Sequence, residues 1–320
     1  MCNNVPEIWN GKESQANIAG ANIPVDDSAE YKLVWNDEFE LDHLDLRKWS
    51  SDGSGCWSGD YKYCLSGELW RFENSVGTLI MEKFDEPDEN GKLYWDAGSF
   101  ITNDTMNFAH GYLEMRAKVP FFGKGEFPAF WLLSHNAVLA RRDPSYKNPD
   151  YKIEIDIFEN FSSKNGLVPN IHKYENVPDG RHCQLSGIDQ GASKNGTRTF
   201  RFPDNIDPND WHTYGFLWTE NLMSFSVDGE FYYTYDLRKN FGPFGGTEGF
   251  HQPVGILISN QIFSEGWTKV SDWAASIGAA KEEIFPLEYS VDYVRLYQKP
   301  GSTLYVNALD NRVSVRPCRD

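Results

Sequence analysis

The chain has 320 residues, of which 40% are hydrophobic and 15% aromatic, so it is long enough for one large domain with a sizeable core. It carries 30 Lys and Arg against 47 Asp and Glu, and the net charge of −17 argues against a nucleic-acid partner, which needs a basic surface. No stretch reaches the roughly 20 apolar residues of a membrane span, so we expect no transmembrane segment.

The two ends of the chain differ in pattern from its middle. Residues 1–30 are polar and lack an apolar period, which predicts an extended N-terminal arm. We expect residues 31–300 to fold as one domain, with residues 301–320 as a C-terminal extension packed on it. The N-terminus lacks the basic and apolar regions of a signal peptide.

From Tyr31 onward, short segments alternate apolar and polar residues, as half-buried strands do. Asp228-Gly229 is a dipeptide typical of tight hairpin turns, and a single helix is predicted near residues 271–283. Two polar, Asn-rich stretches, 135–150 and 173–205, are predicted to be long loops. The alternating segments are 112–119, 213–218, 223–232 and 290–297. Many short strands with little helical periodicity predict an all-β antiparallel sandwich.

The five cysteines favour an oxidising compartment. Cys56 and Cys64 flank a short loop that a disulfide would close, and Cys2 and Cys318 would be a second pair if the termini lie close together. We therefore expect a protein that is secreted or at the cell surface. A lipid anchor through Cys2 is left open, because Met1-Cys2 also fits a start at a lipidated cysteine.

The most informative segment is 151–160, where three acids alternate with apolar residues. Strict alternation places Glu154 and Asp156 on one face of the strand and Glu159 on the other. A β-bulge at Ile157-Phe158 would add one residue and turn all three acids into the same cleft. Two carboxyls about 5 to 5.5 Å apart are what retaining glycoside hydrolysis needs.

Two other interpretations of this segment stay open. The acids could belong to a solvated edge strand, where charge prevents aggregation. A metal site is the third reading, but the segment contains no His or Cys, and calcium loops prefer Asp, Asn and Gly turns. We expect no metal at the acids and no required cofactor, with a structural calcium ion elsewhere left open.

The sequence resembles glycoside hydrolase family 16, the laminarinase, lichenase, agarase and carrageenase group. Glu154-Ile155-Asp156-Ile157-Phe158-Glu159 is similar to the bulged ExDxxE signature of that family, and the resemblance spans about residues 33–298. It implies a concanavalin-like β-jelly roll of two curved antiparallel sheets, with the substrate lying across the concave sheet. Further segments resembling family landmarks, in order, are 34–39, 110–116, 127–133, 210–214, 227–229 and 291–297.

The resemblance also implies roles for individual residues. Glu154 matches the nucleophile, Asp156 the assisting residue, Glu159 the acid/base and Trp131 a ring beside the sugar that is cleaved. Further candidates for substrate binding are Glu68, Trp70, Trp95, His172 and Asn260. The implied activity is that of a retaining endo-β-glycosidase that cuts internal linkages of a polysaccharide.

The sequence also departs from the family pattern in two places. Ile153 stands where many glucan-cleaving members have Gly, and the strand 258–263 differs from the usual one. We expect a monomer acting on a neutral β-1,3- or mixed-linkage glucan, with a β-galactan of the agar, carrageenan, porphyran or mucin type as the alternative. Two rival functions stay open. One is transfer of the glycosyl unit to a sugar in place of water, and the other is a non-catalytic, lectin-like binding role.

Overall fold

A computed structural model describes residues 30–50, 55–58, 62–65, 69–84, 94–123, 125–134, 152–161, 163–174, 182–184, 192–193, 198–238, 249–262 and 285–306. Regular structure in these ranges consists of β-strands in two sheets. The helix predicted near 271–283 and the loop predicted at 135–150 lie outside them. No helix among the described residues is long and apolar enough to cross a membrane.

Sheet A has the strand order β14-β18-β17-β16-β9-β20-β5-β6-β3-β2, with β1 paired to β20 and β4 to β5. Its pairings are antiparallel except that of β3 with β6. The strands are β1 (Lys32–Asp37), β2 (Gly55–Ser58), β3 (Lys62–Leu65), β4 (Trp70–Glu73), β5 (Val76–Phe84), β6 (Tyr94–Ala97), β9 (Gly111–Lys118), β14 (Ala192–Ser193), β16 (His212–Trp218), β17 (Leu222–Val227), β18 (Glu230–Asp236) and β20 (Leu287–Gln298).

Sheet B has the order β13-β12-β11-β10-β19-β8-β21, with β15 paired to β12 and β7 to β19. All of its pairings are antiparallel. The strands are β7 (Ser99–Ile101), β8 (Met106–Ala109), β10 (Glu126–Ser134), β11 (Lys152–Glu159), β12 (Gly166–Tyr174), β13 (His182–Gln184), β15 (Phe200–Arg201), β19 (Val254–Ile262) and β21 (Thr303–Val306).

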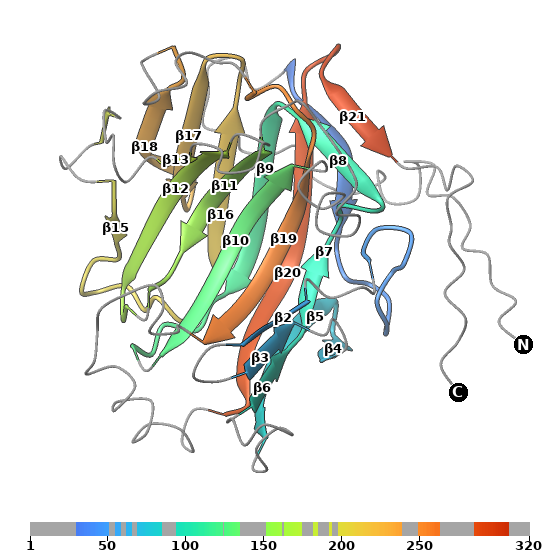
Figure 1. Ribbon diagram of the computed structural model, residues 1–320, viewed down its shortest axis with the longest axis vertical. Helices are drawn as coiled ribbons and strands as arrows, with labels where there is room; N and C mark the ends of the chain where they lie inside the picture. The colour runs from blue at the N-terminus through green and yellow to red at the C-terminus, as the bar shows by residue number, and fades with distance from the viewer. Residues whose placement is uncertain are drawn as a thin grey trace, which may run out of the picture.

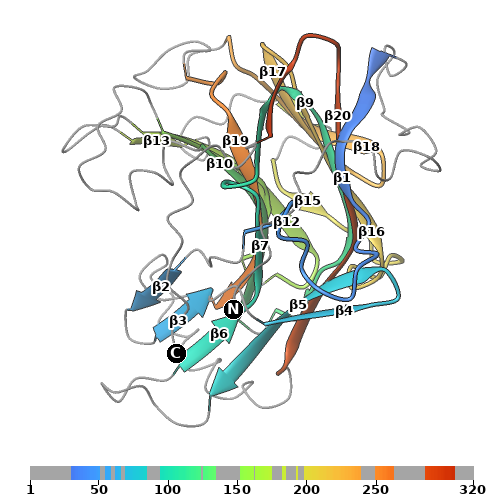
Figure 2. The ribbon, with the colours of Figure 1, turned by 90° about the vertical axis from the view of Figure 1, so that its right-hand side faces the viewer.

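The two sheets pack face to face and curve together, with sheet B toward the viewer in Figure 1 and the sandwich seen from its side in Figure 2. Alternation along each strand decides which side chains enter the space between them. On β9, Leu113, Met115 and Ala117 join the core, whereas Glu114 and Arg116 lie on the outer face. The predicted all-β jelly-roll sandwich is confirmed.

The hairpin predicted at Asp228-Gly229 is confirmed, because these two residues connect β17 to β18. Both have positive φ, 50° and 79°, as the tight turns that match strand twist require. The loop predicted at 173–205 is only partly correct, since β12 continues to Tyr174 and three short strands follow. Strands of two or three residues are too short to show an alternating pattern.

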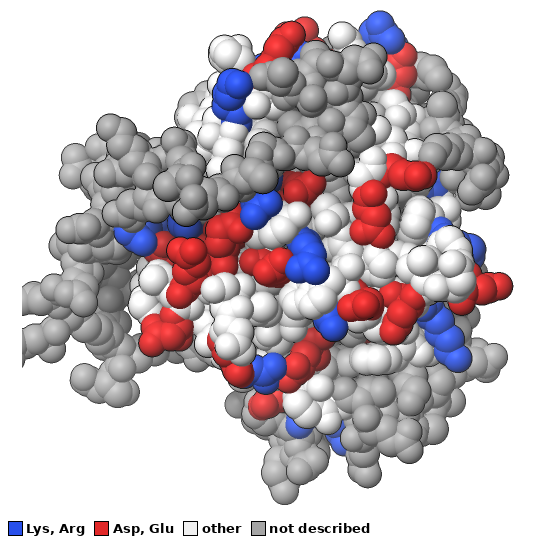
Figure 3. Space-filling view, turned by 180° about the vertical axis from the view of Figure 1, so that it is seen from behind, with Lys and Arg blue, Asp and Glu red and all other residues white. Residues whose placement is uncertain are grey.

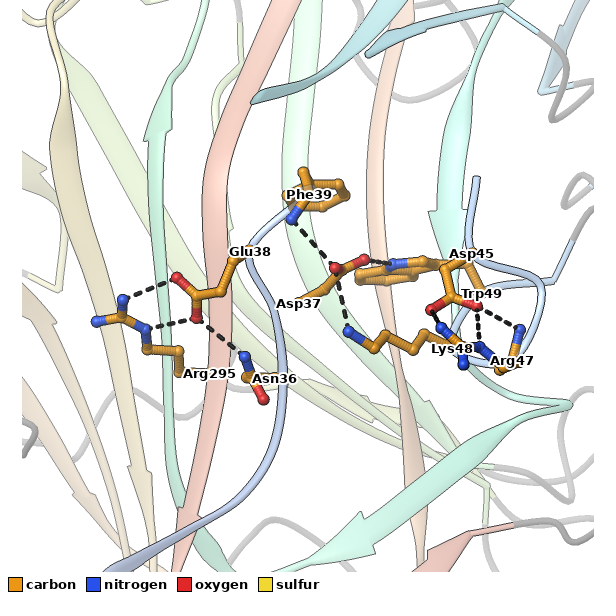
Figure 4. A network of polar contacts seen from close by, with 9 residues as sticks. All are labelled: Asn36, Asp37, Glu38, Phe39, Asp45, Arg47, Lys48, Trp49 and Arg295. Carbon is orange, nitrogen blue, oxygen red and sulfur yellow. Dashed lines mark hydrogen bonds and ion pairs between the residues drawn. The ribbon is translucent and has the colours of Figure 1, made fainter. Parts of the chain in front are cut away.

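Polar contacts fix the beginning of the domain to the middle of sheet A (Figure 4). The Glu38 carboxylate accepts two hydrogen bonds from the Arg295 guanidinium on β20, at 2.9 and 2.8 Å. The neighbouring Asp37 carboxylate accepts from the Trp49 indole at 2.6 Å and from the Phe39 amide at 3.1 Å. The family landmark at 34–39 is therefore structural, because these acids are occupied in holding β1 and the segment after it.

The outer face of sheet A carries charges of both signs side by side (Figure 3). Arg116 pairs with Asp292 across β9 and β20, and both the Arg116 guanidinium and the Lys118 ammonium lie over the Trp211 ring, at 4.9 and 5.5 Å from its centroid. Each pair lies in high dielectric and adds little stability. These surface pairs do not indicate a catalytic site. The acid-rich strand singled out in the sequence belongs to sheet B.

Candidate active site

The three acids of β11 lie on the face of sheet B that is turned away from the core. Ile153 and Ile155 alternate with them and pack in the core. Glu154 pairs with Leu133 of β10 and His172 of β12, and both partners lie on the acids' side of the sheet. The strand therefore has the apolar back and acidic front that its sequence predicts.

An extra residue is present in β11 after Asp156, as predicted. Asp156 pairs with Trp131 and Asn170, and the register on both neighbouring strands shifts before Glu159 is reached. Ile157 and Phe158 are consecutive, yet both belong to the core. A bulge has this effect, because two residues take the place of one in the alternation.

The bulge brings Glu159 back to the face of Glu154. Glu154 and Glu159 are five positions apart, but their partners on β10, Leu133 and Ala129, are only four apart, and the partners on β12 are also four apart. An even number of steps keeps both side chains on one face, about 13 Å apart along the backbone at ~3.3 Å per residue. Two long Glu side chains leaning together can close most of that gap.

Burial differs among the three carboxyls, and it shifts the pKa of Glu159. The Glu154 side chain is 19% exposed and that of Asp156 is 4% exposed, while Glu159 is buried. Burial raises the pKa of Glu159 well above the usual 4.5, and the negative charges of Asp156 and Glu154 raise it further, against the opposing charge of Arg198. Glu159 is thus the member of the cluster suited to hold a proton.

His172 completes the cluster from the next strand. Its Nε2 lies 3.2 Å from Asp156 Oδ2 and 3.9 Å from Glu154 Oε1, and its ring stacks on Tyr174 with centroids 5.9 Å apart. Burial alone would lower the pKa of His172, but the hydrogen bond to Asp156 and the charges of both acids outweigh burial and raise it. A protonated His172 therefore compensates part of the negative charge.

Glu154, Asp156 and His172 each offer a ligand atom, and these atoms lie within 4.8 Å of one another. The set is close enough to share a cation. The His172 Nε2 that would bind a metal also lies 3.2 Å from Asp156 Oδ2, the distance of an ion pair. The absence of a metal here stays a prediction.

Trp131 lies directly beside the acids. It pairs with Asp156 across β10 and β11, belongs to a cluster with Ala129 and Leu133, and is 9% exposed. Its indole Nε1 donates a hydrogen bond to Ser259 Oγ of β19 at 3.1 Å. The indole plane is therefore held in place on the acids' face of sheet B, and contact between this ring and a sugar stays a prediction.

Two of the expected substrate contacts are buried in the structure. Asn260 lies on the same face of β19 as Ile258, which packs in the core. The exposed fraction of Asn260 is 1%. Its neighbour Ser259 lies on the acids' face, where it accepts the hydrogen bond from Trp131, and it is also 1% exposed. Trp95 on β6 has no exposed surface, so no ring face is open to a sugar.

Of the last two candidates, the structure describes one. Trp70 lies on β4 of sheet A, where its Nε1 donates to the Ser99 carbonyl at 3.2 Å, and it stays a predicted contact. Glu68 lies outside the described residues. Arg198, whose charge acts on both Glu159 and His172, was missed, since a lone arginine in a polar segment gives no signal in the sequence.

The fold is thus a jelly-roll sandwich that carries a candidate acid/base cluster on the outer face of sheet B. The family model described as glycosyl hydrolases family 16 matches residues 59–282, so the chain belongs to that family and is a glycoside hydrolase.

Individual relatives agree with this assignment. A beta-glucanase of Rhodothermus marinus is 28% identical over 85% of this chain and 87% of its own length. A keratan-sulfate endo-1,4-beta-galactosidase of Sphingobacterium multivorum is 25% identical over 93% of this chain and 62% of its own length. The structure of SCLam, a non-specific endo-beta-1,3(4)-glucanase, is 26% identical, with a TM-score of 0.56 and coverage of 85% of this chain and 92% of that one.

The bulge can be tested by changing its length. Deleting Ile157 leaves a regular strand in which the two glutamates are four positions apart and still share a face. We expect this variant to lose about 2–4 kcal/mol of stability with the core side chain, but to keep measurable hydrolysis. Inserting one Ala between Phe158 and Glu159 turns Glu159 toward the core, and hydrolysis should fall to background. Reducing-end release and thermal unfolding measure both effects, and equal activity in the two variants would contradict the register argument.

Proposed function

We propose that the chain is a retaining endo-β-glycosidase with Glu154 as nucleophile and Glu159 as acid/base. The observation that carries this proposal is the register shift in β11, which aligns both glutamates on one open face. The raised pKa of Glu159 supports its role as the acid, because it retains a proton at a pH where ordinary carboxyls have lost theirs.

The proposed reaction has two steps. Glu159 donates its proton to the glycosidic oxygen while the Glu154 carboxylate attacks the anomeric carbon, so the bond to the leaving sugar breaks and an ester to Glu154 forms. Water then attacks the same carbon, its proton passes to Glu159, and Glu154 leaves as carboxylate. Asp156, contacted by His172, holds the nucleophile in position, and the Trp131 ring lies against the sugar.

For the substrate we propose a β-1,3- or mixed-linkage β-glucan. The similarity to the beta-glucanase and to the endo-beta-1,3(4)-glucanase supports this choice, and the net charge of −17 disfavours a polyanion. A β-galactan is the second candidate, because the keratan-sulfate endo-galactosidase matches 93% of this chain. We further propose that the protein acts outside the cell, where such polysaccharides occur.

A polysaccharide panel tests the substrate. The purified chain is incubated with laminarin, mixed-linkage glucan, agarose, carrageenan and desulfated keratan, and the linkage at each new reducing end is determined. We expect internal cleavage of the two glucans, with specific activity at least about tenfold above that on any galactan. Preferential cleavage of a galactan would select the second candidate. A protein that binds one of these glycans and releases no ends would be a lectin, contrary to the proposal.

The roles of the two glutamates can be separated by rescue with azide. Glu154→Ala should lose activity by roughly 10³-fold or more, and azide should restore turnover of an activated aryl glycoside by forming an α-glycosyl azide. Glu159→Ala should instead form a glycosyl-enzyme that azide releases as the β-azide. Nuclear magnetic resonance distinguishes the two products, and the opposite assignment of anomers would reverse the proposed roles.

The pH profile tests the proton held by Glu159. Because burial and then the charges of Asp156 and Glu154 raise the pKa of Glu159, kcat/KM should stay high until the pH rises through that pKa. Asp156→Asn removes one negative neighbour, so the pKa of Glu159 falls and the basic limb moves to lower pH. The exposed Asp204→Asn is the control and should leave the limb in place. An unmoved limb in Asp156→Asn would remove Glu159 as the titrating acid.

A further inference from the structure

An exposed aromatic ring lies just beyond the last acid of β11. Phe161 follows Glu159 by two residues and is 37% exposed. Its ring packs on Phe127 with centroids 5.1 Å apart. Phe127 lies on β10 in phase with Ala129, the partner of Glu159, so it is on the same face as the acids. Phe127 is buried at 6% exposure, so Phe161 supplies the exposed ring of this pair at the Glu159 end of the acid row.

The backbone that carries Phe161 is held firmly. Asn160 is fully buried, and its side-chain amide donates to the carbonyls of Ser163 and Gly166 at 2.8 and 2.9 Å. Its side-chain oxygen accepts from the Ser163 amide at 2.8 Å, and its own amide donates to the Pro128 carbonyl at 3.0 Å. These four hydrogen bonds of Asn160 stabilise the turn between β11 and β12. The exposed ring therefore sits on a preorganised support, as a binding group should.

Position relative to Glu159 determines which sugar this ring can meet. This step rests on the proposed function, in which Glu159 protonates the oxygen that joins the cleaved sugar to the leaving sugar. The pair of rings lies on the acids' face beside Glu159, so it is near the sugar that this oxygen joins to the cleaved one. We propose that Phe161, supported by Phe127, binds the apolar face of the sugar on the leaving-group side.

The same ring would bind an acceptor sugar after the first step. A hydroxyl of a sugar held there attacks the anomeric carbon of the glycosyl-enzyme in place of water, its proton passes to Glu159, and the ester bond to Glu154 breaks. The product is a longer oligosaccharide. Phe161 is therefore a specificity-determining residue that sets how the intermediate divides between transfer and hydrolysis, and it raises transfer because a sugar face stacks on its ring.

The test is the ratio of transfer products to hydrolysis products from one oligosaccharide that the wild-type protein cleaves. In Phe161→Ala this ratio should fall about three- to tenfold, and KM for the oligosaccharide should rise by a similar factor. The kcat for a glycosyl fluoride, which has no leaving sugar, should stay within about twofold of wild type. Phe161→Tyr keeps the ring and should restore the ratio.

Leu46→Ala is the matched control, because Leu46 is another exposed apolar side chain, 51% exposed, on the segment after β1. It should change neither the ratio nor KM. If Phe161→Ala keeps the wild-type ratio and KM, the inference is wrong while the hydrolase proposal stands. If the wild-type protein cleaves no oligosaccharide, the proposed function fails first. Loss of the fluoride activity together with the ratio would mean that Phe161 only supports the fold, and would also overturn the inference.

Discussion

The register of a single strand is the constraint on which the site depends. A β-strand alternates with a period of two, so an error of one residue transfers every later side chain to the opposite face. In β11 the alternation is broken once, and Ile157 and Phe158 both enter the core. The gain in apolar burial from that second side chain stabilises the irregularity, since each fully buried residue of this size contributes about 1.5–3 kcal/mol. Packing between the sheets therefore holds Glu159 toward the cleft, and the chemistry of the open face depends on the core behind it.

Placing three carboxyls on one face has an electrostatic cost that the fold only partly offsets. Burial of Glu159 beside Asp156 and Glu154 is unfavourable for its ionised form, as its raised pKa shows. His172 supplies a compensating charge at 3.2 Å from Asp156, and Arg198 acts on Glu159 from outside the three central strands. The positive charge of His172 therefore lies beside Asp156, the assisting acid of the proposed mechanism. The pKa of Glu159 stays raised, which favours its protonated form. Such a local conflict between stability and charge is what is expected of a functional site.

Much of this site could be predicted from the sequence, and the limits have physical causes. The acids and the bulge could be predicted because their signal lies within one short segment. Three acids alternate there with Ile, and the alternation is interrupted once, at Ile157-Phe158. The burial of Asn260 could not be predicted, because the face of a strand residue depends on its phase relative to the neighbouring strand, and β10 puts Ser259 on the acids' face. The burial of Trp95 could not be predicted either, because a ring in a strand gives the same pattern whether it is buried or exposed. Phe161 was missed for a similar reason, since its exposure depends on the hydrogen bonds by which Asn160 closes the turn.

A second buried glutamate shows why a perturbed carboxyl alone does not identify an active site. Glu114 lies on the outer face of sheet A, and burial raises its pKa. Its carboxylate, however, accepts hydrogen bonds from the hydroxyls of Tyr293 at 2.9 Å and Tyr112 at 3.2 Å, and the Arg295 charge also favours its ionised form. Those donors satisfy the oxygens and link β9 to β20, so the group stabilises the sheet. Glu159 differs because its strongest charged neighbours are other acids, which favour its protonated form, the form that the proposed reaction uses. The distinction lies in the partners of each carboxyl, and it supports the proposed chemistry on sheet B and a structural role for Glu114 on sheet A.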